Sequence, residues 1–407
     1  MTLLTQSLWR DEAFSALLIQ HNPLDIVKLT AGDSNPPLFY LLLHYWTLVF
    51  GNSEVAMRSL TLIFLLATAV TMYFIGRMFF RRSGVWLAAL TITQPFLFYY
   101  GFELRGYSLL ALLATLTIYF YLRNKRWLLF LSAAALLYTH LFGWWVILIL
   151  GGWSIFRRQN AWPLVAAGLV GLLWVPNYLN FARVGGGFLS TPGIPDLLTT
   201  LVALGAPILI LTLPYLRGLW RQERFQLFFL LWIVPIVGTF LISQVKPEFL
   251  DRYLIVTVPA EILLVGMTIG KRFSAVLLTA TVIIQAVLSY QSFGNPQKPP
   301  FRELANFVLS QRQPGDAIVN ASSLTYFESQ YYGLNAPIYS PQGTVPYYVG
   351  KVLIPDRDIL TKLPGTKRLW LIELEEGGGS LTTPLPLRIE ETRNFGRLKL
   401  TLYETPT

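Results

Sequence analysis

Long apolar runs follow one another through most of the 407-residue chain, and they limit the folds open to it. A helix needs about 20 mostly apolar residues to cross roughly 30 Å of hydrocarbon. Only 13% of the residues are charged, against about 25% in a typical soluble domain. The runs lie at 55–80, 84–101, 104–122, 127–142, 143–156, 161–181, 196–216, 225–243, 253–270 and 273–290. The sequence therefore predicts an all-α, polytopic membrane domain.

Short basic clusters separate these runs at every second connection. They lie at Arg81–Arg82, Arg123–Arg126, Arg157–Arg158, Arg217–Arg224 and Lys271–Arg272. Because positive charge in short loops marks the cytoplasmic side, we expect these connections inside. The short runs 127–142 and 143–156 count as two helices, since the charge alternation then holds. The intervening loops, the N-terminal segment and the polar tail are therefore expected outside the cell membrane.

Charge and missing motifs exclude several classes of function. The net charge is +10, but Lys and Arg are dispersed between apolar runs, which indicates membrane topology rather than nucleic-acid binding. The chain has no cysteine, so neither disulfides nor thiolate metal sites are expected. Neither a cleavable signal peptide nor a P-loop, zinc-peptidase or serine-hydrolase motif is present in the sequence. Any chemistry here would draw on an already activated substrate.

The composition changes at about Asn295, where three prolines lead into a mixed polar sequence. We expect an outer interfacial loop with amphipathic helices over 1–54, a transmembrane helical domain over 55–293, and a small extracytoplasmic α/β or α+β domain over 294–407. In the last, the spacing predicts a helix over Arg302–Arg312, strands over Ala317–Asn320 and Leu369–Leu374, and a loop at Gly377–Gly379.

Asp11 and Glu12 form an acidic pair before an expected amphipathic helix at the membrane surface. A carboxylate partly shielded from water has a raised pKa, which suits it to accept a proton from an attacking hydroxyl. The alternative is that both acids merely occupy a helix N-terminus, where the dipole favours them. Asp33 is a third outer carboxylate, followed by Pro36 and Pro37, which start a helix well. It either joins Asp11 in chemistry or, with Ser34 or Asn35, caps that helix.

Charged and aromatic residues recur in the later outer loops. Glu103, Arg105 and Tyr107 end one apolar run, and Arg252 and Tyr253 open another. Arg105 could grip a phosphate with a hydrogen bond from Tyr107, or pair with its neighbours. For Arg252 the structural alternative to a site role is that its side chain extends to the phosphates of the lipid headgroups. His140 is expected to position other groups, and Glu261 falls inside a predicted span, where ionisable groups are costly and often functional.

These motifs, taken in order, resemble one family. Asp11-Glu12, Asn35-Pro36-Pro37-Leu38-Phe39-Tyr40, Arg58, Glu103-Leu104-Arg105-Gly106-Tyr107, Tyr138-Thr139-His140 and Arg252-Tyr253-Leu254 together are similar to the membrane glycosyltransferases of the C-type fold. Within them the likeness is to the family 39 group, which includes protein O-mannosyltransferases and lipid A aminoarabinose transferases. The resemblance covers the membrane part and fades in the tail.

The resemblance implies a hexosyl- or pentosyltransferase that uses a polyprenyl-phosphate-linked sugar and inverts the anomeric centre on the extracytoplasmic face. Asp11 would then be the general base, with Glu12 supporting it and Asp33 near the acceptor or donor sugar. The donor phosphate and substrate would be held by Glu103, Arg105, Tyr107, His140, Arg252 and Tyr253. The acceptor would be a lipid, a glycan or a protein.

Two features leave alternatives open. The family normally has a membrane helix before the acidic loop, whereas few residues precede Asp11 here. Asp11 and Asp33 could together bind a divalent cation, and the sequence establishes no cofactor. A transporter or flippase of lipid-linked glycans, or an inactive glycan-binding relative, are the other interpretations, and only Glu261 favours transport.

Overall fold

The structure, a computed structural model, describes residues 1–33, 35–79, 83–184, 189–205, 218–267, 274–295, 298–375 and 388–404. The chain divides into two compact units. Met1–Asp33 joins Asn295–Thr407 in what we call the terminal unit, and Ser34–Gly294 forms the helical unit. The sequence-based division kept residues 1–54 together, whereas here the first 33 residues belong with the C-terminal part. The reason is local packing of the N-terminal helix on C-terminal residues, described below.

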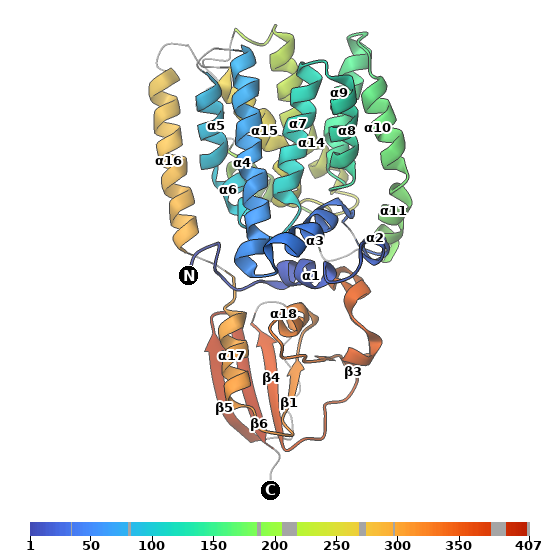
Figure 1. The fold of residues 1–407 in the computed structure, drawn as a ribbon, viewed down its shortest axis with the longest axis vertical. Helices are drawn as coiled ribbons and strands as arrows, with labels where there is room; N and C mark the ends of the chain where they lie inside the picture. The colour runs from blue at the N-terminus through green and yellow to red at the C-terminus, as the bar shows by residue number, and fades with distance from the viewer. Residues whose placement is uncertain are drawn as a thin grey trace. The chain divides into compact units, whose positions relative to one another are not determined.

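The helical unit is built from successive α-helices joined by short turns (Figure 1). They are α3 (Leu38–Phe50), α4 (Glu54–Phe79), α5 (Ser83–Thr93), α6 (Pro95–Gly101), α7 (Tyr107–Leu122), α8 (Arg126–Leu137), α9 (Gly143–Phe156), α10 (Trp162–Leu172), α11 (Val175–Val184), α12 (Ile194–Leu204), α14 (Glu223–Ile242), the 3-10 helix Asp251–Thr257, α15 (Val258–Gly266) and α16 (Ser274–Gly294). Each predicted apolar run contains helix in its described part, so the mostly helical architecture is confirmed.

By length and apolar composition, three of the described helices can cross a membrane: α4, α14 and α16. A fourth span results if α10 and α11, which meet at a 46° bend, count as one. Other apolar helices of the unit are shorter, and the predicted run 84–101 is split by Pro95 into α5 and α6. The chain returns to a helix directly after the break. The Gln94 side chain accepts a hydrogen bond from the Leu97 amide at 2.6 Å and so caps the start of α6. The basic residues Arg81, Arg82, Arg217, Lys271 and Arg272 lie outside the described residues.

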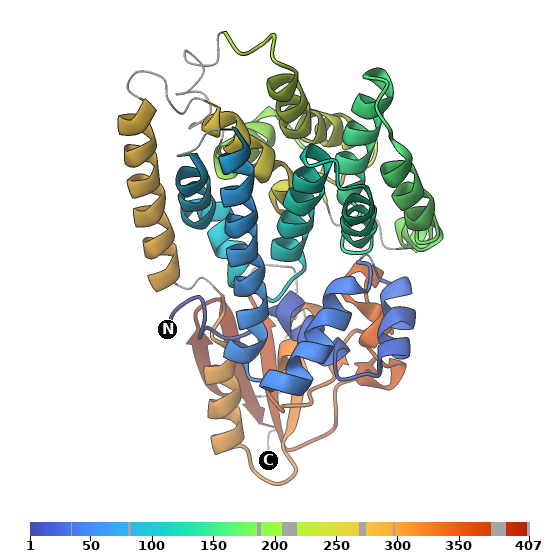
Figure 2. The same ribbon diagram turned by 45° about the horizontal axis from the view of Figure 1, so that its top comes forward.

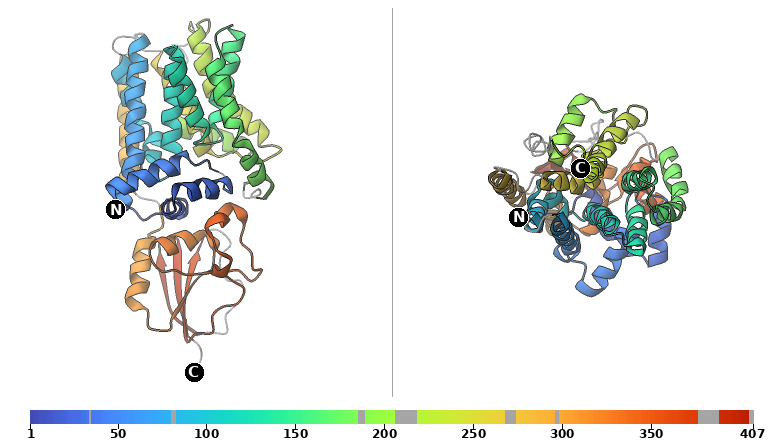
Figure 3. Two further views of the ribbon diagram at one scale, coloured as in Figure 1. Left: turned by 45° about the vertical axis from the view of Figure 1, so that its right-hand side comes forward. Right: turned by 90° about the horizontal axis from the view of Figure 1, so that it is seen from above.

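Helix α7 lies in the middle of the bundle, between α4 and α8 (Figure 3, right). Most of its side chains are buried, as expected for a helix that is apolar on all sides. Close approach of α4 and α5 depends on glycine, since a Cβ at Gly76 would lie 2.8 Å from the Cα of Gly84. Helix α16 packs on α5 and α6 at the edge of the bundle (Figure 2). The bundle thus fixes where each inter-helical turn lies.

The terminal unit contains a six-stranded mixed sheet in the order β3-β2-β1-β4-β6-β5. Strands β1 to β4 are parallel neighbours, and β6 is antiparallel to both β4 and β5. The strands are β1 (Ala317–Asn320), β2 (Ile338–Tyr339), β3 (Ile359–Leu360), β4 (Arg368–Leu374), β5 (Arg388–Phe395) and β6 (Leu398–Glu404), and the helices are α1 (Arg10–Leu18), α2 (Pro23–Ala31), α17 (Phe301–Gln311) and α18 (Tyr326–Tyr331). The predicted small sheet domain is therefore confirmed, while the Gly377–Gly379 loop lies outside the described residues.

Helix α17 covers one face of this sheet (Figure 3, left). Phe301, Leu304, Ala305 and Val308 follow the helical period and pack with Trp370 and Ile372 of β4. Near it, the N-terminal segment docks on the C-terminal part of the same unit. The Leu8 amide donates to the Tyr332 hydroxyl at 2.7 Å, and Phe14 of α1 meets Phe327 of α18 edge to face at 5.3 Å. These contacts hold α1 against α18.

Candidate active site

Asp11 and Glu12 lie inside the first turn of α1, which begins at Arg10. The sequence placed them before a surface helix, so that expectation is corrected: the helix starts earlier and most of its side chains are buried. Acids in a first turn are stabilised by the helix dipole. The two side chains differ in setting. Asp11 keeps 15% of its side-chain surface exposed and accepts from Arg10 Nε at 3.0 Å, whereas Glu12 is fully buried.

Glu12 is engaged in an ion pair within the terminal unit. Lys298 Nζ lies 2.9 Å from Glu12 Oε2, and the Lys298 side chain is only 6% exposed. The same ammonium group stands 5.9 Å from the centroid of the Trp9 ring. Of the two acids, only Asp11 is therefore partly exposed.

Glu328 on α18 is a further buried acid close to this turn. Burial raises the pKa of Glu328 to about 8, with Arg10 opposing and Asp11 reinforcing the shift. Its carboxyl is therefore largely protonated at neutral pH. No sequence signal distinguished Glu328, because it stands in a short helix of the mixed polar tail.

Asp33 follows α2 directly and is 8% exposed. Its neighbour Tyr347 donates its hydroxyl to the Gly32 carbonyl at 2.7 Å. Burial and the charge of Asp33 raise the pKa of Tyr347. Asp33 does not cap α3, whose N-cap is Pro37 without a side-chain hydrogen bond. Among the described side chains, no three of His, Asp and Glu gather into a possible metal site.

In the helical unit, several of the predicted phosphate-binding residues come together. The loop before α3, the N-terminus of α7 and the turn after α8 line one small hollow, which has a volume of about 10 Å³ and room for little more than a water molecule. Its lining includes Asn35, Pro36, Phe39, Tyr40, Arg105, Gly106, Tyr107, Thr139 and His140. The Leu38 amide donates to the Tyr138 carbonyl at 3.1 Å and so ties the start of α3 to that turn.

Arg105 and His140 form the polar part of this hollow. Arg105 Nη1 donates to the Tyr40 hydroxyl at 3.3 Å. His140 Nδ1 accepts from the Phe142 amide at 3.2 Å, which assigns the imidazole proton to Nε2. Burial, together with the positive charges of Arg105 and Arg252, lowers the pKa of His140 to about 3. His140 is therefore neutral at physiological pH and lies near both guanidinium groups.

Arg252 and Tyr253 join the cluster from the 3-10 helix Asp251–Thr257. The Tyr253 ring lies 5.2 Å from His140 and 5.1 Å from Phe142, and Arg252 lies 5.8 Å from the Tyr253 ring centroid. Tyr107 completes the aromatic set, at 5.9 Å from His140. Two cations among aromatic hydroxyls and one neutral imidazole suit an anion such as phosphate.

Glu103 and Arg58 are buried components of the surroundings. Glu103 is 2% exposed and interacts electrostatically with Tyr100, as do Asp251 and Arg252. Arg58 is fully buried and lies 3.9 Å from Glu54, one turn earlier in α4. Because both side chains are buried, their positions suit a structural role rather than contact with a ligand.

An apolar pocket of about 350 Å³ lies beside this cluster, between α9 and α14. Trp144, Trp145, Leu148 and Ile242 line it, and Phe142 joins it to the Tyr253 ring. No sequence pattern indicated this pocket, since the two helices that form it are distant in sequence. Tyr40 and Lys298 were missed for the same reason.

The fold defines the class: this is a membrane protein with the fold of the C-type glycosyltransferases. The chain is similar to ArnT from Cupriavidus metallidurans, an aminoarabinose transferase of that fold, with 11% identity and a TM-score of 0.63 to its apo structure. Against the structure of the same protein bound to undecaprenyl phosphate, the identity is 12% and the TM-score 0.66. Both alignments cover 98% of this chain and 94% of the other. No family model and no curated protein matches the sequence.

Proposed function

We propose that this protein is a glycosyltransferase that moves a sugar from a polyprenyl-phosphate donor to an extracytoplasmic acceptor. The observation that carries the proposal is the cluster of Arg105, Arg252 and neutral His140 at one end of the helical bundle. A fold-level neighbour holds undecaprenyl phosphate, the kind of lipid that such a cluster would bind. Guanidinium forks match phosphate oxygens in pairs, and their charge favours a phosphate leaving group.

The apolar pocket between α9 and α14 suits the prenyl chain of this donor. It begins at Phe142, whose ring is 5.1 Å from Tyr253, and it continues along Trp145 and Leu148. A phosphate held by Arg105 and Arg252 would thus leave its hydrocarbon chain an apolar path. Burial of apolar surface contributes about 0.8 kcal/mol per CH₂ group. The prenyl chain would then supply much of the donor affinity.

Asp11 is the general base in this proposal, because it is the partly exposed acid of α1. It takes the proton of the acceptor hydroxyl as the acceptor oxygen attacks the anomeric carbon. The bond from that carbon to the donor phosphate oxygen breaks, and polyprenyl phosphate leaves with the electron pair. One displacement inverts the anomeric centre and needs no covalent intermediate. Asp33 would orient a sugar hydroxyl, and Glu12 would support the fold of α1.

The direct test is the release of polyprenyl phosphate from a polyprenyl-phosphate sugar by the purified full chain. Asp11→Asn should lower the release rate about 100-fold to 10,000-fold, the usual contribution of a general base, with donor binding retained. Asp25→Asn serves as the matched control, because Asp25 is an acid of α2 whose side chain is 44% exposed. Full activity of Asp11→Asn would remove the base assignment.

The basic clusters support the proposed orientation. Helix α7 runs from Tyr107, in the phosphate cluster, to Leu122, next to Arg123 and Lys125. The cluster and this basic loop therefore lie at opposite ends of α7, and positive loops face the cytoplasm. A reporter fused after Arg158 should read as cytoplasmic. An extracytoplasmic reading there would overturn this orientation.

Transport of a lipid-linked glycan is the second candidate, and it rests on Glu261. This carboxyl is 3% exposed and lies one turn after the 3-10 helix gives way to α15, the kind of interrupted helix seen at transporter sites. In vesicles containing a lipid-linked sugar, Glu261→Gln would abolish movement across the bilayer if transport is the function. Release of polyprenyl phosphate without such movement supports transfer instead.

A further inference from the structure

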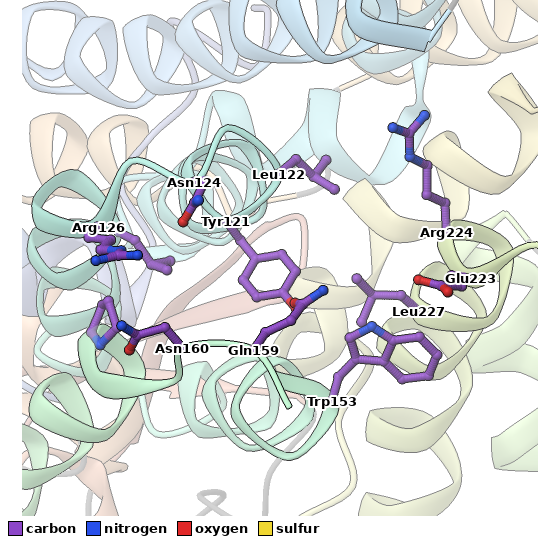
Figure 4. Close-up of a pocket in the computed structure, with 12 residues that line it drawn as sticks. Tyr121, Leu122, Asn124, Arg126, Trp153, Gln159, Asn160, Glu223, Arg224 and Leu227 are labelled. Atoms are coloured by element: carbon purple, nitrogen blue, oxygen red, sulfur yellow. The ribbon is translucent and has the colours of Figure 1, made fainter. Parts of the chain in front are cut away.

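A second polar pocket lies at the other end of the helical bundle, at the end of α7 opposite to Tyr107 (Figure 4). It has a volume of about 440 Å³, within the usual range for sites that hold small ligands. It forms where α7 and α9 end and where α8, α10 and α14 begin. Figure 4 shows Arg126 and Asn160 on one side, and Glu223, Leu227 and Trp153 on the other.

Positive charge dominates this pocket. The three segments that border it, 121–129, 153–163 and 218–227, hold seven basic residues (three, two and two) and one acid, Glu223. An ion pair with Arg157 neutralises Glu223. Arg126 makes no ion pair with any residue in the described part of the chain, and Arg224 rests over the Phe79 ring at 4.6 Å. Among the described residues, neither the Arg126 nor the Arg224 guanidinium group forms an ion pair, since the Glu223 carboxylate pairs with Arg157.

The amide side chains around the pocket turn their carbonyl oxygens toward the protein. The Tyr121 hydroxyl donates to Gln159 Oε1 at 2.9 Å, and Ser154 Oγ donates to that hydroxyl at 3.2 Å. Asn160 Oδ1 accepts from the Trp162 amide at 3.1 Å. With these oxygens engaged, the amide nitrogens of Gln159 and Asn160 are left to donate to a ligand. Because the one acid of the lining, Glu223, is already paired with Arg157, these donors and cations favour an anion.

Aromatic residues place this pocket at the level of the membrane interface. The Trp127 side chain is 70% exposed, and its ring lies 5.0 Å from the ring of Trp162. Exposed tryptophans gather where the headgroups of a bilayer lie. Basic pockets between membrane helices at that level bind the headgroups of anionic lipids.

We propose that this pocket binds a phosphate ester, with Arg126 as its main contact and with Gln159, Asn160 and Arg224 assisting. Its position favours the headgroup of an anionic phospholipid as the source of the phosphate. The pocket lies at the far end of α7 from the proposed donor cluster, so the ligand here would differ from the reacting lipid. By contacting all three helices, such a lipid would stabilise the packing of the ends of α8, α10 and α14 against one another.

The test is lipid retention by the full chain in nanodiscs made of phosphatidylcholine with phosphatidylglycerol. After extraction, mass spectrometry should find phosphatidylglycerol enriched on the wild type, and Arg126→Gln should lower that enrichment about tenfold. Arg224→Gln should give a smaller loss. Arg123→Gln is the matched control, because Arg123 caps the end of α7, just before Arg126 begins α8, and does not line the pocket. A second arm offers glycerol 3-phosphate to protein in pure phosphatidylcholine nanodiscs.

The two arms of the experiment distinguish a lipid headgroup from a soluble phosphate ester as the ligand. Enrichment that is lost in Arg126→Gln but kept in Arg123→Gln supports the site and a lipid source. Binding of glycerol 3-phosphate with the same dependence on Arg126 supports the site with a soluble ligand. No preference for either phosphate, or equal losses in both variants, overturns the proposal. An unchanged melting temperature of Arg126→Gln would show that its loss of ligand is not a loss of fold.

Discussion

Lys298 Nζ lies 2.9 Å from Glu12 Oε2, and the two side chains are 6% and 0% exposed. This ion pair joins the first turn of α1 to the segment just before α17, nearly 300 residues further along the chain. Glu12 is the direct neighbour of Asp11, the proposed base. The ion pair therefore helps to fix the position of the α1 backbone that carries Asp11.

Lys298→Met should destabilise the terminal unit strongly. Removing one partner of a buried ion pair costs about 3–5 kcal/mol, because the remaining charge stays buried without its closest counter-charge. Replacing both partners, as in Glu12→Leu with Lys298→Met, should restore most of that loss because no buried charge remains. Thermal unfolding of the four proteins of this cycle in detergent measures the coupling.

Lys351→Met provides the matched control for this cycle. Lys351 pairs with Asp356 at 2.6 Å, but the Asp356 side chain is 95% exposed, and exposed pairs contribute about 0–1 kcal/mol. If the Lys298 and Lys351 variants lose stability equally, the pair with Glu12 has no special role.

Glu328→Gln should remove a pH dependence of the terminal unit. The pKa of Glu328 is raised to about 8 by burial, so the folded chain binds its proton more tightly than the unfolded chain does. Stability should therefore fall as pH rises from about 4.5 to 8, by up to about 1.4 kcal/mol per pH unit. Hydrogen exchange of α1 and α18 in the full chain measures this slope. Glu303→Gln, whose carboxyl accepts from Ser7 Oγ, is the control, and an equal slope in wild type and Glu328→Gln would contradict the assignment.

The sequence predicted the elements well where local signals are strong. The helix Phe301–Gln311 and the strands Ala317–Asn320 and Arg368–Leu374 were anticipated within one residue at each end, because apolar spacing and flanking turn residues define them. The helices of the helical unit were anticipated from long apolar runs, which are an equally strong local signal. Helix breaks were harder, since Tyr253–Thr257, the later part of the 3-10 segment, continues into α15 as one apolar run.

The partners within the site could not be predicted in the same way. Arg105 and His140 were selected from their loops, but their closeness to Arg252 depends on how three separate turns meet in the bundle. Glu12 was expected beside Asp11 in chemistry, yet its burial depends on Lys298, which no local pattern connects to it. Contacts across such sequence distances are set by tertiary packing.

Tyr40→Phe should weaken transfer through Arg105. The Tyr40 hydroxyl accepts from Arg105 Nη1 at 3.3 Å, and hydrogen bonds to charged groups contribute about 1.5–3 kcal/mol. Without the hydroxyl the guanidinium loses one contact that orients it, so kcat/KM for polyprenyl phosphate release should fall about tenfold.

Tyr45→Phe is the control for that variant, because Tyr45 lies on the same helix with 56% of its surface exposed. Arg105→Gln should cost more, about 100-fold to 1,000-fold, as expected for loss of a charge-stabilising donor. Wild-type rates in Arg105→Gln would show that the phosphate binds elsewhere.

His140→Gln should leave the shape of the pH–rate profile between pH 5 and 8 unchanged while lowering its height. The pKa of His140 is lowered to about 3 by burial and by the charges of Arg105 and Arg252, so the imidazole is neutral throughout that range. Its role is then to position the arginines, which a glutamine fulfils only in part.

Unlike the shape of the rate profile, the folding stability of the wild type should depend on pH through His140. As pH falls below about 6.5, the unfolded chain binds a proton on this imidazole that the folded chain does not bind, so stability should fall by up to about 1.4 kcal/mol per pH unit. His140→Gln should abolish that loss, while His44→Gln on α3 should retain it. A pH–rate step near 6.5 that disappears in His140→Gln would instead make His140 a proton carrier.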